Sequence, residues 1–210
     1  MTGAMSVERV DGRTARRQRG RLAVIEAAFR LLGSGEPATT EMLASEAGIS
    51  TSSLFRYFEG LDDLYRQLAE HFHVQHAELF DASPSPGSDR TDRIAEFVEL
   101  RLRLAAVVAP WGRRVDAYAL THPEVAPVTM DLRQRTARQV DRFFAPELDR
   151  AGSDRRAELA AAIDATTSAS VIRTMRDVHE RSPQQIARSW TSTLALLLAV
   201  HDDRPSSPPE

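Results

Sequence analysis

The 210-residue sequence predicts an all-α protein, and three observations indicate that class. Apolar residues recur every three or four positions, as at Leu61, Leu64 and Leu68, which is the spacing of one helix face. Clusters of Gly, Pro and Ser separate these periodic segments. Residues 39–58 contain two short helical patterns around a turn, and the rest of the chain is organised around this stretch.

The chain before that stretch predicts a basic arm and one helix. Residues 1–14 lack periodicity and are expected to be disordered. A helix is expected over 15–32, and the breaker cluster at 33–37 ends it. The formal net charge of the chain is -3, but its leading segment is rich in cations, namely Arg9, Arg13, Arg16, Arg17, Arg19 and Arg21.

The first short helix is predicted from its capping residues and its inner face. Pro37 is unfavourable inside a helix, and the side chain of Thr39 or Thr40 can accept a hydrogen bond from a first-turn amide. The helix then has a small apolar inner face, formed by Met42, Leu43, Ala44 and Ala47.

A turn and the second short helix follow. Gly48 stands where a chain leaving a helix favours a left-handed residue. Ser50 or Thr51 can cap the second helix, whose inward residues are Leu54 and Phe58. Its outward positions are short hydroxyl residues followed by an aromatic and cationic cluster, namely Thr51, Ser52, Ser53, Phe55, Arg56 and Tyr57.

This outward face has the composition of a nucleic-acid contact surface. Hydroxyls and amides at a helix N-terminus hold phosphates, and short side chains let a helix enter a major groove. A basic arm on an acidic chain is typical of local attraction to DNA. The alternative is an ordinary helical hairpin with a solvated polar surface, because such hairpins also occur in proteins that do not bind DNA.

A longer set of motifs extends the pattern on both sides. The run from Ile25 to Leu68 contains paired alanines at 27–28, LAxxAGIS at 43–50, SLFRYF at 53–58 and a leucine-led helix after them. This ordered set resembles the N-terminal domain of TetR-family transcriptional regulators. The resemblance covers the first third of the chain closely, and the remainder only through its length and helical pattern.

The resemblance implies an N-terminal three-helix helix-turn-helix DNA-binding domain over 15–60. A long fourth helix would join it to a C-terminal helical domain over 61–200 for effector binding and dimerisation, with a disordered tail at 201–210. The expected partners are a palindromic operator in double-stranded DNA, a small-molecule effector and a second copy of the chain. The expected DNA contacts are Arg17, Arg19, Arg21, Thr39, Thr40, Ser50, Thr51, Ser52, Phe55, Arg56 and Tyr57.

Three positions depart from the family pattern. Phe55 stands where the family usually has a Tyr whose hydroxyl bonds a phosphate. Leu61 replaces the Lys that normally opens the fourth helix, and Asp62 and Asp63 follow it. Ala38 occupies the place of the Thr that usually starts the second helix. These departures imply DNA binding that is weaker or more sensitive to salt.

The composition excludes several classes of site. No cysteine occurs, which excludes disulfides, thiolate nucleophiles and cysteine metal sites, and no lysine occurs either. No apolar run is close to the length that a membrane span needs, about eighteen residues. No hydrophobic signal-peptide core follows the N-terminal arginines, so a cytoplasmic location is expected. The chain has no phosphate-binding glycine loop, GxSxG or HExxH motif, so neither enzyme activity nor a cofactor is expected.

The C-terminal two thirds predict further helices. We expect a fourth helix over 61–80, the Pro- and Ser-rich linker 81–89, and then helices over 89–109, 111–120, 128–144, 154–178 and 183–200. The second half of the helix over 89–109 is apolar nearly all round and is expected to be buried on most sides.

The resemblance implies that the last two helices form the dimer interface. The first of them is rich in alanine, which permits close approach of a partner helix, and the second carries an apolar stripe. Packing inside one subunit explains the alanines equally well. The interface candidates are Ile163, Thr167, Ile186, Trp190, Thr193, Leu194 and Leu197.

The resemblance implies an effector pocket among the helices of the C-terminal domain. Its few polar groups indicate a largely apolar or aromatic effector, oriented by Tyr118, Arg114 or His76. His71, His73 and His76 do not share one helix face, so we expect no metal site; a histidine there could instead contact an effector. The pocket candidates are His76, Phe97, Leu104, Trp111, Arg114, Tyr118, Met130, Phe143 and Met175.

The sequence thus predicts a DNA-binding regulator, most simply a repressor that leaves its operator when an effector binds. An activator is a further alternative within regulation. The alternative from another class is a helical ligand-binding protein or enzyme on the same scaffold with weak or lost DNA binding, which Phe55 and Leu61 keep open.

Overall fold

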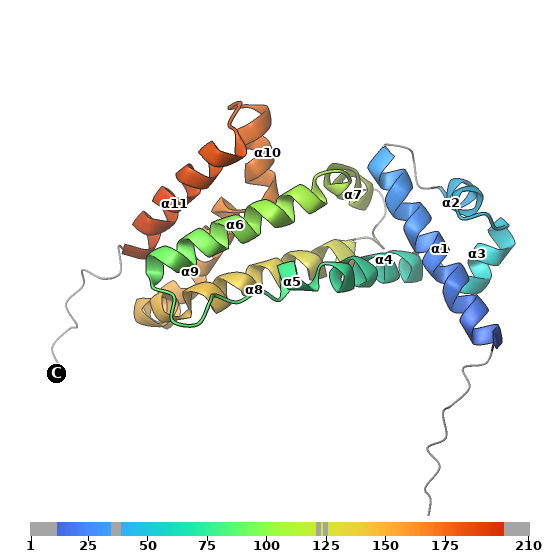
Figure 1. Ribbon diagram of the computed structural model, residues 1–210, viewed down its shortest axis with the longest axis horizontal. Coiled ribbons are helices and arrows are strands. Elements are labelled where there is room, and N and C mark those ends of the chain that lie inside the picture. The colour runs from blue at the N-terminus through green and yellow to red at the C-terminus, as the bar shows by residue number, and fades with distance from the viewer. Residues whose placement is uncertain (1–11, 35–38, 121–122, 124–125, 200–210) are drawn as a thin grey trace, which may run out of the picture. The chain divides into compact units, whose positions relative to one another are not determined.

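The computed structural model describes residues 12–34, 39–120, 123 and 126–199, except for the side chains at 12, 13, 61, 118 and 128. All regular structure in these ranges is helical (Figure 1). Of the arm expected to be disordered over residues 1–14, residues 12–14 are helical and the rest lies outside the described residues. Ala38, the tail 201–210 and the side chains of Leu61 and Tyr118 lie outside them as well.

The helices follow one another along the chain with short connections. They are α1 (Gly12–Ser34), α2 (Thr40–Glu46), α3 (Thr51–Tyr57), α4 (Leu61–Gln75), α5 (Ala77–Phe80), α6 (Arg90–Val108), α7 (Gly112–Ala119), α8 (Ala126–Ala151), α9 (Ser153–Thr166), α10 (Ala169–Asp177) and α11 (Pro183–Ala199).

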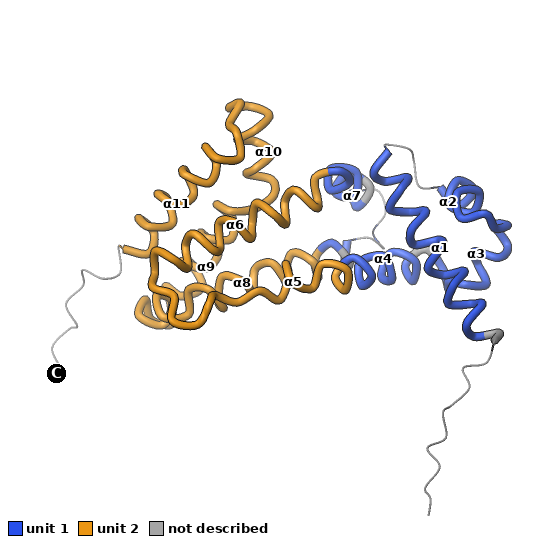
Figure 2. The backbone as a smooth tube through the Cα atoms, viewed as in Figure 1, with its two compact units in different colours: residues 1–72, 110–129 blue, residues 73–109, 130–210 orange. Residues whose placement is uncertain are grey.

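The chain divides into two compact units, coloured separately in Figure 2. Unit 1 contains residues 1–72 and 110–129, and unit 2 contains residues 73–109 and 130–210. The boundary expected at residue 60 therefore coincides with neither unit boundary. In particular, α7 and its flanking residues group with the N-terminal helices.

Unit 1 is built around the packing of α1, α2, α3 and the first part of α4. Its core is apolar, as the helical spacing of the sequence predicts. The buried residues are Val24, Ile25, Ala28, Leu31, Leu43, Ala44, Leu54, Phe58, Leu64 and Leu68.

The start of α7 belongs to the same unit through an aromatic cluster. The Trp111 ring lies edge-on to Phe72 at a centroid distance of 4.8 Å and 6.3 Å from Phe29. Arg114 Nη1 donates to the Leu32 carbonyl of α1 over 2.8 Å. Trp111 and Arg114, which the sequence assigned to an effector pocket, thus pack against α1 and α4.

Unit 2 has its core among α6, α8, α9 and α11. The rings of Phe97, Phe143 and Phe144 pack together, with centroids 5.4 and 5.0 Å from that of Phe97. Trp190 and Leu194 of α11 are buried in the same unit. Glu147, 1% exposed, forms ion pairs with three arginines, namely Arg90, Arg93 and Arg150.

Two expected helices are interrupted, and the helix expected over 128–144 continues to Ala151 past a kink at its predicted end. The fourth ends at Gln75, and after His76, whose φ and ψ are -124° and 28°, only the short α5 follows. The expected helix over 154–178 divides because the Ser168 side chain caps α10 by accepting from the Val171 amide. In α8, Phe144 is non-helical two residues before Pro146, which cannot donate a helix hydrogen bond.

The second half of α6 is less buried than its sequence indicated. Leu104 is buried, but Arg103 and Ala106 are exposed and Val107 is half-buried. Apolar composition alone did not separate a fully buried segment from one with an exposed side, because alanine and valine occur in both settings.

Candidate nucleic-acid interface

The N-terminus of α2 is capped as expected. Thr39 has extended backbone angles, and its Oγ1 accepts a hydrogen bond from the Met42 amide over 3.3 Å. The pKa of Glu41 lies below its ordinary value, chiefly because of a hydrogen bond from its own backbone amide and then from the hydroxyls of Thr40 and Thr39. Thr39 thus has a local structural role in addition to its predicted DNA contact.

The turn between α2 and α3 adopts the predicted left-handed conformation. Gly48 has a φ of 68°, and the Ile49 amide donates to the Ala44 carbonyl over 2.9 Å. Ser50 then caps α3, with its Oγ accepting from the Ser53 amide over 3.2 Å. These bonds fix the direction in which α3 leaves the turn.

The outer face of α3 combines an aromatic ring, a cation and a hydroxyl. Phe55 is 53% exposed, although its side chain is large and apolar. Arg56 is exposed beside it and donates to the Ser53 hydroxyl over 2.7 Å. Ser52, one turn before Phe55, is exposed as well, and Thr51 is half-buried. These four residues, Thr51, Ser52, Phe55 and Arg56, are called the α3 outer face below.

Tyr57 fixes α3 against α1 instead of projecting freely. A Cβ atom built on Gly20 would lie only 2.4 Å from the Tyr57 ring, so this close approach requires glycine. The sequence did not indicate this contact, because a glycine inside a helical pattern gives no sign of its neighbour. Arg17 and Arg19 of the same part of α1 are exposed.

Asp63, in the first turn of α4, is buried and forms a polar cluster. Its Oδ2 accepts from the Glu59 amide over 3.1 Å, and its Oδ1 accepts from Gln67 Nε2 over 2.8 Å and from Arg66. Arg21 of α1 lies 3.7 Å from Oδ2, with its guanidinium 5.5 Å from the centre of the Phe58 ring. We call these partners the Asp63 cluster.

The charge of Asp63 is stabilised in the fold. Burial raises its pKa, but the hydrogen bonds from Gln67 and Glu59 and the charges of Arg66 and Arg21 outweigh burial and hold the pKa below its ordinary value. Asp63 is thus directed at its own domain and not at a DNA backbone. Arg21, predicted to contact DNA, is half-buried in this cluster.

The pocket candidates are distributed over both units. Trp111 and Arg114 belong to unit 1, whereas His76, Phe97, Leu104, Met130, Phe143 and Met175 belong to unit 2. Phe97 and Phe143 lie together in the core, but Met130 is 50% exposed. The pocket remains a proposal.

Most of the dimer candidates lie inside the subunit. Five of them, Ile163, Thr167, Ile186, Trp190 and Leu194, are at most 1% exposed within the single chain, which removes their side chains from a surface open to a partner. The reason is that the apolar stripe of α11 packs on α6 and α9 of its own unit. Thr193 and Leu197 are half-buried.

The histidines of the fourth helix have separate neighbours. The His71 ring lies 6.1 Å from that of Phe29. His73 Nε2 accepts a hydrogen bond from Arg135 Nη1 over 2.9 Å. Over the residues that the structure describes, no three His, Cys, Asp or Glu side chains are placed to hold a metal ion, and no helix is long and apolar enough to cross a membrane.

Comparison with known proteins confirms the resemblance indicated by the motifs. Residues 24–68 match the sequence model of the family described as "Bacterial regulatory proteins, tetR family". The chain is 32% identical over 93 residues to "HTH-type transcriptional repressor LfrR" of Mycolicibacterium smegmatis. That match covers 44% of this chain and 49% of LfrR, so it spans about half the length of this relative.

Solved structures share the fold over most of the chain. A protein of Mesorhizobium loti, assigned to the TetR family of transcriptional regulators, has a TM-score of 0.63 and 17% identity, covering 88% of this chain and 98% of its own. A transcriptional regulator from Rhodococcus sp. Rha1 has a TM-score of 0.62 and 17% identity, covering 90% of this chain and 99% of its own. At this identity the likeness establishes the fold alone.

Proposed function

We propose that this chain, whose residues 24–68 form a tetR-family domain, is a DNA-binding transcriptional regulator that acts in the cytoplasm. The observation that carries the proposal is the α3 outer face. Phe55 and Arg56 are exposed on a helix whose direction is fixed by the Ser50 cap, the Gly48 turn and the contact of Tyr57 with Gly20. Such a face can contact base edges while the arginines contact phosphates.

The burial of Asp63 supports DNA binding over the alternative of a scaffold that has lost it. An exposed pair of carboxylates at the start of α4 would repel a DNA backbone, but Asp63 is 8% exposed and is matched by Arg66 and Arg21. Only Asp62 of this pair is exposed. The missing Tyr hydroxyl at Phe55 still implies fewer phosphate contacts and greater sensitivity to salt.

We further propose a homodimer that binds a pseudo-palindromic operator, because two copies of α3 can then enter major grooves about 34 to 36 Å apart. The exposed sides of α9 and α11 are available for this contact. Leu196 of α11 is 69% exposed, and small residues are exposed on both helices, namely Ala157, Ala161, Ala165, Ser192 and Ala199.

Repression relieved by a small molecule is the form of regulation that we propose. LfrR is described as an HTH-type transcriptional repressor, and it is 32% identical to this chain over 93 residues. A ligand that fits only the DNA-incompetent arrangement shifts the population by its differential affinity, and no chemical reaction is needed.

The first test is selection of genomic DNA fragments by the purified full chain at two salt concentrations, with sequencing of the retained fragments. A shared palindrome retained at both concentrations supports the regulator, and sedimentation should give twice the chain mass of 23.3 kDa. Only salt-labile binding without a shared motif would leave the ligand-binding scaffold as the better description.

Replacing Arg56 by Ala should weaken binding to all DNA sequences and reduce the slope of log affinity against log salt by about 1. The matched control is Arg138→Ala, an exposed arginine on α8 in unit 2. Binding isotherms at several salt concentrations provide the measurement. An unchanged slope in Arg56→Ala would remove this residue from the phosphate contacts.

A further inference from the structure

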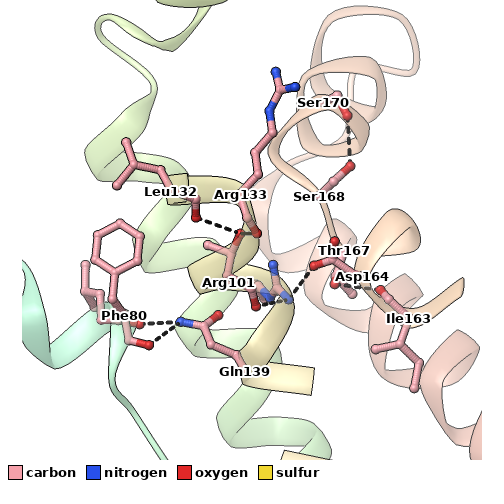
Figure 3. A network of polar contacts seen from close by, with 12 residues as sticks. Phe80, Arg101, Leu132, Arg133, Gln139, Ile163, Asp164, Thr167, Ser168 and Ser170 are labelled. Atoms are coloured by element: carbon pink, nitrogen blue, oxygen red, sulfur yellow. Dashed lines mark hydrogen bonds and ion pairs between the residues drawn. The ribbon is translucent and has the colours of Figure 1, made fainter. Parts of the chain in front are cut away.

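The interior of unit 2 contains a charged side chain that the DNA interface does not use. Arg101 of α6 is 5% exposed, and its Nη2 donates to Asp164 on α9 over 2.8 Å and to the Thr136 carbonyl on α8 over 3.0 Å (Figure 3). Its guanidinium carbon lies 4.8 Å from the centre of the Phe97 ring. Arg101 Nε is buried and has no hydrogen-bond partner among the residues that the structure describes.

Gln139 on α8 has an unpaired acceptor, which complements the unpaired donor of Arg101. Its side chain is fully buried, and its Nε2 donates to the carbonyls of Leu79 and Phe80 over 2.5 and 3.4 Å. Because a carbonyl oxygen only accepts, these bonds fix which end of the amide is nitrogen. Gln139 Oε1 therefore faces the other way, and it is buried without a partner in the described part of the chain.

The two unpartnered atoms belong to one layer of unit 2. In an α-helix a carbonyl points toward the residues about one turn later, so the Thr136 carbonyl points toward Gln139 and Val140. Arg101 binds that carbonyl and thus stands beside the turn that carries Gln139, as Figure 3 shows. The unsatisfied donor and the unsatisfied acceptor thus belong to two side chains at the same turn of α8.

Buried polar groups are nearly always hydrogen-bonded, so a complementary pair without partners indicates a partner from outside the chain. We propose that Arg101 and Gln139 form a recognition site for a small neutral ligand with an apolar body and a hydroxyl or carboxamide group. This group accepts from Arg101 Nε–H and donates to Gln139 Oε1. The proposal deepens the proposed function, because the ligand is the effector of the regulator.

The charges around Arg101 select a neutral ligand. Asp164 already balances the guanidinium, so a carboxylate ligand would bring an unmatched charge into the interior. A purely apolar ligand would leave both polar atoms unpaired. The rings of Phe97, Phe143 and Phe144 supply the apolar surroundings. This site differs from the sequence expectation that Tyr118, Arg114 or His76 orients the effector.

The test uses the isotope-labelled full chain and four probes of similar size, namely benzamide, phenol, benzoate and toluene. Benzamide and phenol should bind and should shift the NMR signal of one arginine Nε–H, identified by its proximity to the Phe97 ring. Arg101→Lys keeps the charge that pairs with Asp164 but removes Nε–H, so its affinity for benzamide should fall about tenfold. Arg138→Lys, on the exposed side of α8, should bind benzamide like the wild type.

Equal binding of benzoate or toluene, or unchanged affinity in Arg101→Lys, would overturn the proposal. If Arg101→Lys fails to fold, as circular dichroism would show, the Nε–H signal of the wild-type chain decides alone: a shift with benzamide supports the site and no shift refutes it. Operator binding is measured separately. Ligand binding without operator binding would refute the regulator but not the site, and operator binding without ligand binding would refute the site.

Discussion

Asp63 in unit 1 and Arg101 in unit 2 are both buried charges, but their hydrogen bonding differs. Asp63 accepts bonds at both oxygens, from Glu59, Gln67 and Arg66, with Arg21 nearby. Arg101 is paired through Nη2 alone among its described bonds, and its Nε has no partner among the described residues. The difference indicates two uses of a buried charge. A charged side chain whose hydrogen-bonding atoms are all paired holds helices together, whereas one with an unpaired atom can still bind a ligand.

Asp63→Ala should have the largest effect on stability. It removes the acceptor of the Glu59 amide and Gln67, and we expect the free energy of unfolding of unit 1 to fall by about 2 to 3 kcal/mol. The loss is not larger because Arg21 and Arg66 are partly exposed and can be solvated by water when the carboxylate is removed. Amide hydrogen exchange measures the stability of unit 1 separately from that of unit 2. A loss confined to unit 2 would contradict the assignment.

The same cluster predicts a smaller, pH-dependent effect. Since the pKa of Asp63 is lowered in the folded state, its contribution is present at neutral pH and is lost as the pH falls through the folded pKa, below the ordinary Asp range. Asp63→Asn should therefore lose less stability on acidification than the wild type. Urea unfolding at a series of pH values compares the two, and parallel curves would show that Asp63 does not contribute.

Arg101→Lys should have the smallest effect on stability. The ammonium can still pair with Asp164, and Nε–H has no partner among the described residues. The bond at risk is that of Nη2 to the Thr136 carbonyl, so we expect a change of about 1 kcal/mol. Thermal unfolding followed by circular dichroism measures this change. A loss as large as that of Asp63→Ala would mean that Arg101 is as structural as Asp63 and would remove the contrast between the units.

The sequence predicted the local structure of unit 1 well because its signals are local. Thr39 and Ser50 cap their helices, and Gly48 adopts the left-handed turn, as the neighbouring residues indicate. The exposed positions of Phe55 and Arg56 follow from helical periodicity. The family motifs extended this reading beyond the two short helices, and the family model matches residues 24–68.

Interactions between distant segments could not be predicted in the same way. The partner of Gly20 is Tyr57, and the carbonyl bound by Arg114 is that of Leu32, with no periodic sign in either segment. The sequence predicts the apolar face of α11 as a dimer interface, whereas the structure packs it inside unit 2. Helical periodicity shows that a face is buried but not which element buries it. Arg101 directly precedes the apolar second half of α6, and this position of a charged residue was the sequence feature that could have indicated a buried polar site.

The position of the two tryptophans gives each unit its own fluorophore. The chain contains two, and Trp111 packs in unit 1 against Phe29 and Phe72 whereas Trp190 is buried in unit 2. With Trp190 changed to Phe, the emission spectrum belongs to the aromatic cluster at the start of α7; with Trp111 changed to Phe, it belongs to the core beneath α11. Comparing the emission of these two variants during denaturation would show whether the units unfold in one transition or two, without any added dye.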